Sequence, residues 1–156
     1  MSHIRYFRID ERLIHGQILQ KWLKFTGCSH ILVIDDETAK DPIIQSVLEM
    51  TLPGNMNVLF LNVLDGVTQL SKMQEDCFVL MKNLETLQQV FEQGADIEQV
   101  NICRLPYFPG KKKIYHNLFI SDEEEMILKK LMKQKIDVYI QMVPDAEKIY
   151  AVDLLK

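Results

Sequence analysis

A single histidine in a short charged turn is the residue of this chain best suited to catalysis. His15 lies in the segment Arg8–Gln17, whose sequence is R-I-D-E-R-L-I-H-G-Q. Residues 4–9 before the turn are largely apolar, and residues 18–23 after it carry apolar side chains at helical spacing. Open α/β folds place their chemistry where a strand turns into a helix. We therefore expect His15 at the carboxyl edge of a sheet.

The residues around His15 suit a phosphoryl group. Arg8 and Arg12 carry fork-shaped cations that match phosphate oxygens. The backbone N–H groups of Gly16 and Gln17 would lie at the start of the helix, where unpaired donors and the helix dipole favour an anion. A neutral imidazole can act as a nucleophile and hold a covalent intermediate. These residues predict that His15 is catalytic and that the other four bind the phosphoryl group it accepts and passes on.

Two aspartates that follow predicted strands could orient the histidine. Asp10 can accept an N–H from the imidazole or pair with Arg12, and so fix which ring nitrogen is free. Asp35 and Asp36 can orient the histidine turn or cap the turn that follows them. This pair also resembles the magnesium-binding acids of response-regulator receivers, but the strand Phe78–Met81 ends in lysine and asparagine, where a receiver has its phosphorylated aspartate. We predict Asp10 and Asp35 as histidine-orienting residues, and no metal site.

The segment Arg8–Gln17 resembles the phosphorylation-site loop of the IIB components of the mannose class of the bacterial sugar phosphotransferase system. The resemblance covers almost the whole chain in the family's order. It implies that His15 takes a phosphoryl group on Nδ1 from a IIA component and gives it to a sugar that enters through the IIC and IID membrane components. It implies that no metal or organic cofactor is needed. The other matching segments are Trp22, Ile31–Glu37, Ala39–Pro42, Lys82–Asn83, Val100–Ile102, Gln141–Pro144 and Val152–Leu154.

A second loop departs from the family's pattern, which is N-x-G-x-M with a glycine several residues further on. Asn101 and Gly110 match this pattern. Cys103 stands in place of the first glycine, Arg104 follows it, and Leu105 replaces the methionine. Because a side chain restricts φ and adds a Cβ, we expect an altered geometry for this second active-site loop.

The irregular segment Arg104–Lys113 combines two prolines, two aromatic residues and three lysines. It follows a predicted strand, so its start should lie at the same sheet edge as the histidine. Its Pro-Tyr pair, together with R-I-D-E-R, is similar to family members for amino sugars such as N-acetylgalactosamine. A short basic run is usually a solvated loop, but this one can also form a partner-docking rim. The predicted rim residues are Tyr107, Lys111, Lys112 and Lys113.

Length and composition indicate one globular domain, a IIB domain over residues 1–156. The chain is 47% apolar and 26% charged, and no apolar run approaches the roughly 20 residues that span a bilayer. The net charge of −4 argues against nucleic acid as a partner. The N-terminal residues are too charged for a signal peptide. We therefore expect a cytoplasmic protein that meets the membrane only through its IIC and IID partners.

Several other chemistries do not fit the sequence. The six glycines never form a G-x-G, and no P-loop is present, so ATP is not expected as the direct phosphoryl donor. The three cysteines are odd in number and far apart, which predicts buried thiols. Other classes of IIB component have a cysteine directly after the first strand, where this chain has Asp10. His3, His30 and His116 have no ligand-like spacing.

Strand-like and helix-like segments alternate along the chain. Asn83 and Ser121–Glu124 carry helix-start signals, the latter a capping box, and Asp65 could begin another helix. This alternation predicts an α/β fold with a mostly parallel open sheet and helices on both faces. The predicted strands are Ile4–Arg8, His30–Ile34, Asn57–Leu61, Phe78–Lys82, Gln99–Cys103 and Asp137–Gln141, with an added pair at Ile114–His116 and Leu118–Ile120.

One alternative function shares this fold. A non-catalytic flavodoxin-like binding or regulatory module would keep His15 as a structural helix cap. The two functions differ in whether His15 becomes covalently phosphorylated.

Overall fold

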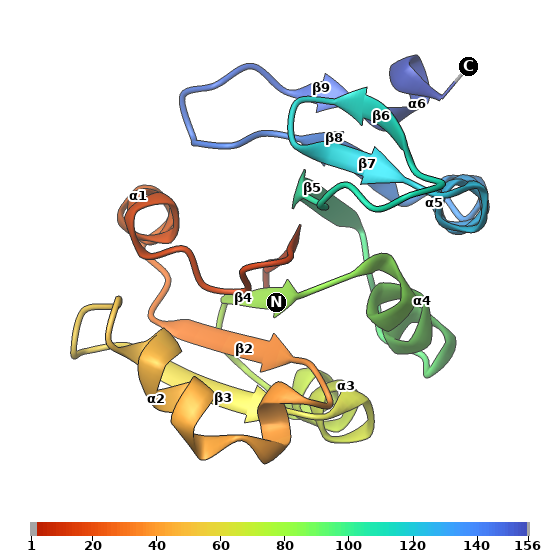
Figure 1. The fold of residues 1–156 in the computed structure, drawn as a ribbon. Coiled ribbons are helices and arrows are strands. Elements are labelled where there is room, and N and C mark those ends of the chain that lie inside the picture. The colour runs from red at the N-terminus through yellow and green to blue at the C-terminus, as the bar shows by residue number, and fades with distance from the viewer. Residues whose placement is uncertain (1–2, 156) are drawn as a thin grey trace.

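Seven strands form one sheet that carries helices on both of its faces (Figure 1). The computed structural model describes residues 3–155, so residues 1, 2 and 156 of the expected domain lie outside the described residues. In spatial order the strands are β3 (Asn57–Leu61), β2 (His30–Ile34), β4 (Cys77–Met81), β1 (Arg5–Asp10), β5 (Gln99–Arg104), β8 (Asp137–Ile140) and β9 (Ile149–Tyr150). The β8–β9 pairing is antiparallel, and the other pairings in this sheet are parallel. The predicted mostly parallel sheet is confirmed.

The helices divide between the two faces of the sheet (Figure 1). One face carries α1 (Gly16–Thr26) and α2 (Pro42–Glu49), and the other carries α3 (Val63–Lys72), α4 (Leu84–Glu92) and α5 (Asp122–Lys133). The remaining elements are a 3-10 turn, η1 (Thr38–Lys40), a hairpin of β6 (Lys112–Tyr115) and β7 (Leu118–Ile120), and the short helix α6 (Ala151–Leu154).

Each face of the sheet has its own apolar core, because side chains along a strand alternate between the faces. In β1, Phe7 and Ile9 join the core under α3, α4 and α5, whereas Tyr6 packs on the core under α1. The same alternation turns Arg8 and Asp10 toward the α1 face. Both are almost fully buried, with 4% and 1% of their surface exposed. The end of β1 is therefore a buried polar site within an otherwise apolar layer.

The strands β1 and β5 are neighbours, but the chain leaves them in opposite directions. After β1 it crosses through α1 to β2, and after β5 it crosses to β8 through α5 on the other face. The carboxyl ends of β1 and β5 therefore form a topological switch point, where open α/β sheets bind ligands. The turn that contains His15 follows the first of these ends, and the segment from Arg104 begins at the second.

The sequence predicted most elements to within about two residues. Asn83 caps α4, and Ser121 caps α5 in the predicted capping box. The helix α3 begins at Val63, where Asn62 caps it, and not at Asp65 as predicted. The short elements β9 and α6 were not predicted, because two and four residues are too few to show a period.

Candidate functional site

His15 is the N-cap residue of α1, but its imidazole makes no capping hydrogen bond. Its carbonyl accepts the N–H of Leu19 at 2.9 Å, which begins the helical hydrogen bonding. Within the described chain, the N–H groups of residues 16–18 are therefore left without a helical partner and can bind an anion. This geometry gives no support to the alternative in which the His15 side chain is a structural cap.

The turn before His15 has an unusual backbone. Leu13 has a φ of 59°, although it is not a glycine, and its side chain is buried. Its N–H donates to the carbonyl of Asp10 at 2.8 Å. A left-handed conformation at such a residue costs about 1–3 kcal/mol and persists only where the surrounding structure imposes it. The turn is thus held in one shape by its packing and its hydrogen bonds.

Asp10 and Arg12 form an ion pair within this turn. The guanidinium of Arg12 donates from Nε to Oδ1 of Asp10 at 3.0 Å and from one Nη to Oδ2 at 2.8 Å. The backbone N–H of Arg12 also donates to Oδ1, at 2.9 Å. Of the two contacts expected for Asp10, the structure has the pairing with Arg12. Asp10 orients the arginine directly and affects His15 through its charge.

Arg8 approaches the same carboxylate from inside the protein. One of its Nη atoms lies 3.9 Å from Oδ2 of Asp10 and 4.0 Å from the sulfur of Met142. Its other Nη atom is buried and, among residues 3–155, has no hydrogen-bond partner. Arg8 is therefore a buried cation that a single carboxylate, shared with Arg12, neutralises only in part.

The surroundings of His15 favour the neutral imidazole. Partial burial lowers the pKa of His15 below its usual value, and the charge of Arg12 lowers it further. Arg8 and Arg104 act in the same direction, whereas Asp10 opposes them. A nitrogen lone pair is therefore available at neutral pH, as nucleophilic attack requires.

Gly16 is needed for close packing against the segment after α2. A Cβ built on Gly16 would lie 2.7 Å from Cβ and 2.9 Å from the carbonyl oxygen of Thr51. The same carbonyl accepts a hydrogen bond from Nε2 of Gln20 at 2.7 Å. Gln17, by contrast, is exposed. The start of α1 is therefore fixed from its outer side as well as from the sheet.

The structure does not bring the carboxylate of Asp35 to His15. Its Oδ2 accepts hydrogen bonds from the N–H of Thr38 at 3.1 Å and from the Thr38 hydroxyl at 2.7 Å. Asp36 similarly accepts the N–H of Val63 at 3.1 Å. These contacts correct the expectation that Asp35 orients the histidine, because Asp35 caps the turn that follows its own strand and Asp36 caps the start of α3.

The second loop contacts the His15 turn through a β-bulge. The pairing of β1 with β5 jumps from Ile9–Ile102 to Asp10–Arg104, which leaves Cys103 as the extra residue. The Cys103 thiol is buried and donates to Oδ1 of Asn101 at 3.1 Å, and burial raises its pKa to about 11. Cys103 is therefore a protonated packing residue, and the second loop leaves β5 through this bulge.

The bulge joins Arg104 to Glu11, a contact that the sequence did not predict. The N–H of Glu11 donates to the carbonyl of Arg104 at 3.1 Å. Nε of Arg104 in turn donates to Oε1 of Glu11 at 2.7 Å. The sequence signal nearest to this contact is Cys103, which stands where the family's loop pattern has a glycine.

Two of the four predicted rim residues are held against α5 by ion pairs. Lys111 forms an ion pair at 3.0 Å with the buried Glu124, and Lys112 pairs with Glu125. Tyr107 is 60% exposed and packs edge-on against Phe119 with ring centroids 5.5 Å apart. Lys113 is exposed. Two of the three lysines therefore link the hairpin region to α5, and among residues 3–155 Lys113 has no such ion pair.

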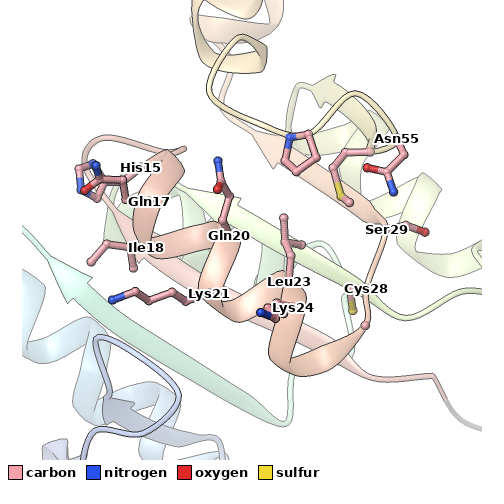
Figure 2. A pocket seen from close by; sticks show the side chains of 13 residues that line it. His15, Gln17, Ile18, Gln20, Lys21, Leu23, Lys24, Cys28, Ser29 and Asn55 are labelled. Atoms are coloured by element: carbon pink, nitrogen blue, oxygen red, sulfur yellow. The ribbon is translucent and has the colours of Figure 1, made fainter.

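A hollow of about 840 Å³ runs along the outer side of α1 and begins at the histidine. Figure 2 shows His15 and Gln17 at one end of it, and Ser29 and Asn55 at the other. Gln20 lies between these ends. The imidazole is therefore reachable by a large partner or substrate.

Within residues 3–155 the side chains offer no metal site and the helices no membrane span. No group of three or more His, Cys, Asp and Glu side chains there could hold a metal ion. No helix in this part of the chain is long and apolar enough to cross a membrane.

The fold and the site together define an α/β protein with an open, mostly parallel sheet. At the switch point of this sheet lies a histidine that is flanked by arginines and whose imidazole makes no capping hydrogen bond. The sequence profile of the family described as PTS system sorbose subfamily IIB component matches residues 4–156. The chain belongs to this family of the phosphotransferase system. It is therefore a phosphotransferase that carries a phosphoryl group in sugar transport. The family resemblance of the histidine segment is confirmed.

Similar proteins and structures cover nearly the whole chain. It is 31% identical over 159 residues to the N-acetylgalactosamine-specific phosphotransferase enzyme IIB component 2 of Escherichia coli K12, with 100% of this chain and 99% of that protein covered. The crystal structure of manxB from Thermoanaerobacter tengcongensis superposes with a TM-score of 0.89 at 33% identity, covering 99% and 97% of the two chains. The mannose-specific EIIAB component of E. coli K12 is 26% identical over 151 residues, which are 95% of this chain and 47% of that protein.

Proposed function

We propose that His15 is the residue that carries the phosphoryl group. The observation behind this proposal is that the imidazole of His15 makes no capping hydrogen bond and lies beside the free N–H groups of α1 at the switch point. Its surroundings also favour the neutral form. Its lone pair can attack phosphorus. Arg12, backed by Arg8, and the N–H groups of Gly16 and Gln17 then bind the phosphoryl oxygens.

The charges around His15 support this role. Three arginines, Arg8, Arg12 and Arg104, face two carboxylates, Asp10 and Glu11, which leaves one positive charge in excess. A phosphoryl group carries a charge of about −1.5 to −2 at pH 7. Its arrival changes the local charge from about +1 to about −0.5 to −1, so the excess positive charge of the empty site faces the anion that His15 would carry.

The reaction has two transfers. In the first, a nitrogen of His15 attacks the phosphorus of the donor's phosphohistidine, a new P–N bond forms, and the donor imidazole leaves. In the second, a hydroxyl oxygen of the sugar attacks the phosphorus and the P–N bond to His15 breaks. The hydroxyl proton passes to solvent, and His15 returns to its free state. Arg12 acts by balancing charge on the equatorial oxygens in both transfers.

The partners follow from the family. We propose a IIA component as the phosphoryl donor, and a sugar delivered by IIC and IID membrane components as the acceptor, with the protein working in the cytoplasm. The EIIAB relative, of which this chain spans 47%, joins A and B parts in one protein, which supports the IIA partnership. The N-acetylgalactosamine-specific relative supports an amino sugar as the substrate. Tyr107 and the lysines that follow it are proposed as part of the docking rim.

The experiment is to phosphorylate the protein with phosphoenolpyruvate, the general phosphotransferase proteins and a IIA component, and to map the modified residue by mass spectrometry. We expect one acid-labile, base-stable phosphoryl group on His15. His15→Ala should abolish labelling, and His116→Ala, which changes an exposed histidine on the hairpin, should not. Labelling that persists in His15→Ala would contradict the proposal.

A further inference from the structure

Arg104 holds the His15 turn through a contact that differs from the other arginine contacts of the site. It uses Nε for Glu11, and among residues 3–155 its two Nη groups have no hydrogen-bond partner. Arg12, in contrast, uses both Nε and one Nη for Asp10. Arg104 therefore has a free pair of donors, which is the fork that matches two phosphoryl oxygens.

The β-bulge brings Arg104 to the edge where α1 begins. Because Cys103 is left out of the pairing, Arg104 lies opposite Asp10 and its backbone bonds to Glu11. Bulges next to functional sites commonly redirect a side chain in this way. The guanidinium is close enough to lower the pKa of His15 through its charge. Backbone and electrostatic observations thus agree that Arg104 belongs to the surroundings of the imidazole.

We propose that Arg104 is a further phosphoryl-binding arginine beside Arg12, and that Glu11 holds it in place until a phosphoryl group arrives on His15. The inference rests on the proposed function of His15. A phosphoryl group has up to twice the charge of a carboxylate, so it competes with Glu11 for the guanidinium. The side chains of Glu11 and Arg104 are 29% and 37% exposed, and an ion pair with that exposure contributes little to stability and separates easily.

This arrangement has a consequence for the carboxylate. If Glu11 competes with the phosphoryl group, removing its charge should help Arg104 bind the phosphoryl oxygens. If the ion pair only joins the two loops, removing either partner should have the same harmful effect. The two partners therefore give opposite results under the proposal and equal results under a structural role.

The test uses potassium phosphoramidate, a small donor that needs no docking partner. Nitrogen of His15 attacks its phosphorus, the P–N bond of the donor breaks and ammonia leaves. The rate of phosphorylation of His15 is measured by mass spectrometry for the wild type, Arg104→Gln, Arg104→Lys and Glu11→Gln. Lys82→Gln is the matched control, because Lys82 is an exposed cation just after β4, which neighbours β1.

We expect Arg104→Gln to slow phosphorylation about 10²-fold, the scale of losing one preorganised donor. Arg104→Lys should recover part of the rate, Glu11→Gln should be as fast as the wild type or faster, and Lys82→Gln should be unchanged. In NMR titrations the pKa of His15 should rise in Arg104→Gln and fall in Glu11→Gln. Thermal unfolding checks that each variant is folded. If Arg104→Gln does not fold, the rates of Arg104→Lys and Glu11→Gln test the proposal in its place.

The inference is overturned by wild-type rates in Arg104→Gln, or by equal losses in Arg104→Gln and Glu11→Gln. Failure of the proposed function gives a different result, since the wild type itself would then carry no phosphoryl group on His15.

Discussion

The two arginine–carboxylate pairs of the His15 turn differ in burial and in separation along the chain. Asp10 and Arg12 are two residues apart, and the carboxylate, 1% exposed, accepts three hydrogen bonds from the arginine. Glu11 and Arg104 are 93 residues apart, are both partly exposed, and share one side-chain hydrogen bond.

This difference makes Asp10–Arg12 a fixed contact and Glu11–Arg104 an exchangeable contact. The contact of Asp10 with Arg12 has several hydrogen bonds and is hard to break, because the buried carboxylate would be left charged and unsolvated. A partly exposed pair with one hydrogen bond is replaced by water or by another anion at little cost. A carrier that receives and releases a phosphoryl group needs both, a rigid frame for the histidine and a cation that can change partners.

The largest effect is expected from neutralising the buried carboxylate. Asp10→Asn leaves the buried Arg8 and the partly exposed Arg12 without a counter-charge, so the free energy of unfolding should fall by about 3–5 kcal/mol. The equivalent change Glu11→Gln should lower it by about 1 kcal/mol at most. Urea unfolding of the two variants beside the wild type measures both, and equal losses would remove the distinction between the pairs.

The next effect is on transfer. Arg12→Ala should slow phosphorylation of His15 about 10²–10³-fold, because it removes a preorganised donor that faces the transferring charge. Arg12→Lys should recover only part of this rate, since an ammonium cannot hold two oxygens at fixed geometry. Rates are measured with phosphorylated IIA component on variants shown to be folded by circular dichroism. Near-normal transfer in the alanine variant would show that Arg12 takes no part in phosphoryl transfer.

The contact between Asp10 and Arg12 could be predicted from the sequence because both residues lie in one turn. Arg8, Asp10, Arg12 and His15 fall within eight positions, and a strand that leads into a helix brings such residues together whatever the rest of the fold does. Pairing of Asp10 with Arg12 was one of two expected contacts. The residue types indicated phosphoryl chemistry, and their spacing in one strand-to-helix turn indicated that they lie together.

The exchangeable contact depends on the register between strands that are far apart in the sequence. One unpaired residue, Cys103, decides that Arg104 reaches Glu11, and a one-residue shift leaves no periodic signal in the sequence. The same holds for Lys111, whose partner Glu124 lies on a helix beyond the hairpin. Asp35 was misassigned for the opposite reason, since a local cap of Thr38 competes with any distant role.

The pH dependence of transfer tests the charge balance around the imidazole. If His15 attacks phosphorus as proposed, only its neutral form can do so, and the rate should rise with pH up to the lowered pKa and stay level above it. Below that pKa the rate should fall about tenfold per pH unit. This acidic limb of the pH–rate profile should lie at a lower pH than the usual histidine pKa of about 6.5. Arg12→Lys keeps the charge and should leave the limb in place, whereas Arg12→Ala should move it to higher pH. A wild-type limb above the usual histidine value would contradict this account of the site.

The smallest effect is expected at the rim, where the contrast between held and accessible charges recurs. Lys113 is exposed, so Lys113→Gln should change the free energy of unfolding by less than about 0.5 kcal/mol. It should slow phosphoryl exchange with the IIA component a few-fold at low salt and weaken its salt dependence, because rim charges mainly steer association. Lys111→Gln is the control for a held charge, since it leaves the carboxylate of the buried Glu124 without its cation and should lower stability by about 1–3 kcal/mol. Unchanged exchange rates and salt slopes in Lys113→Gln would show that this segment serves only to join the hairpin to α5.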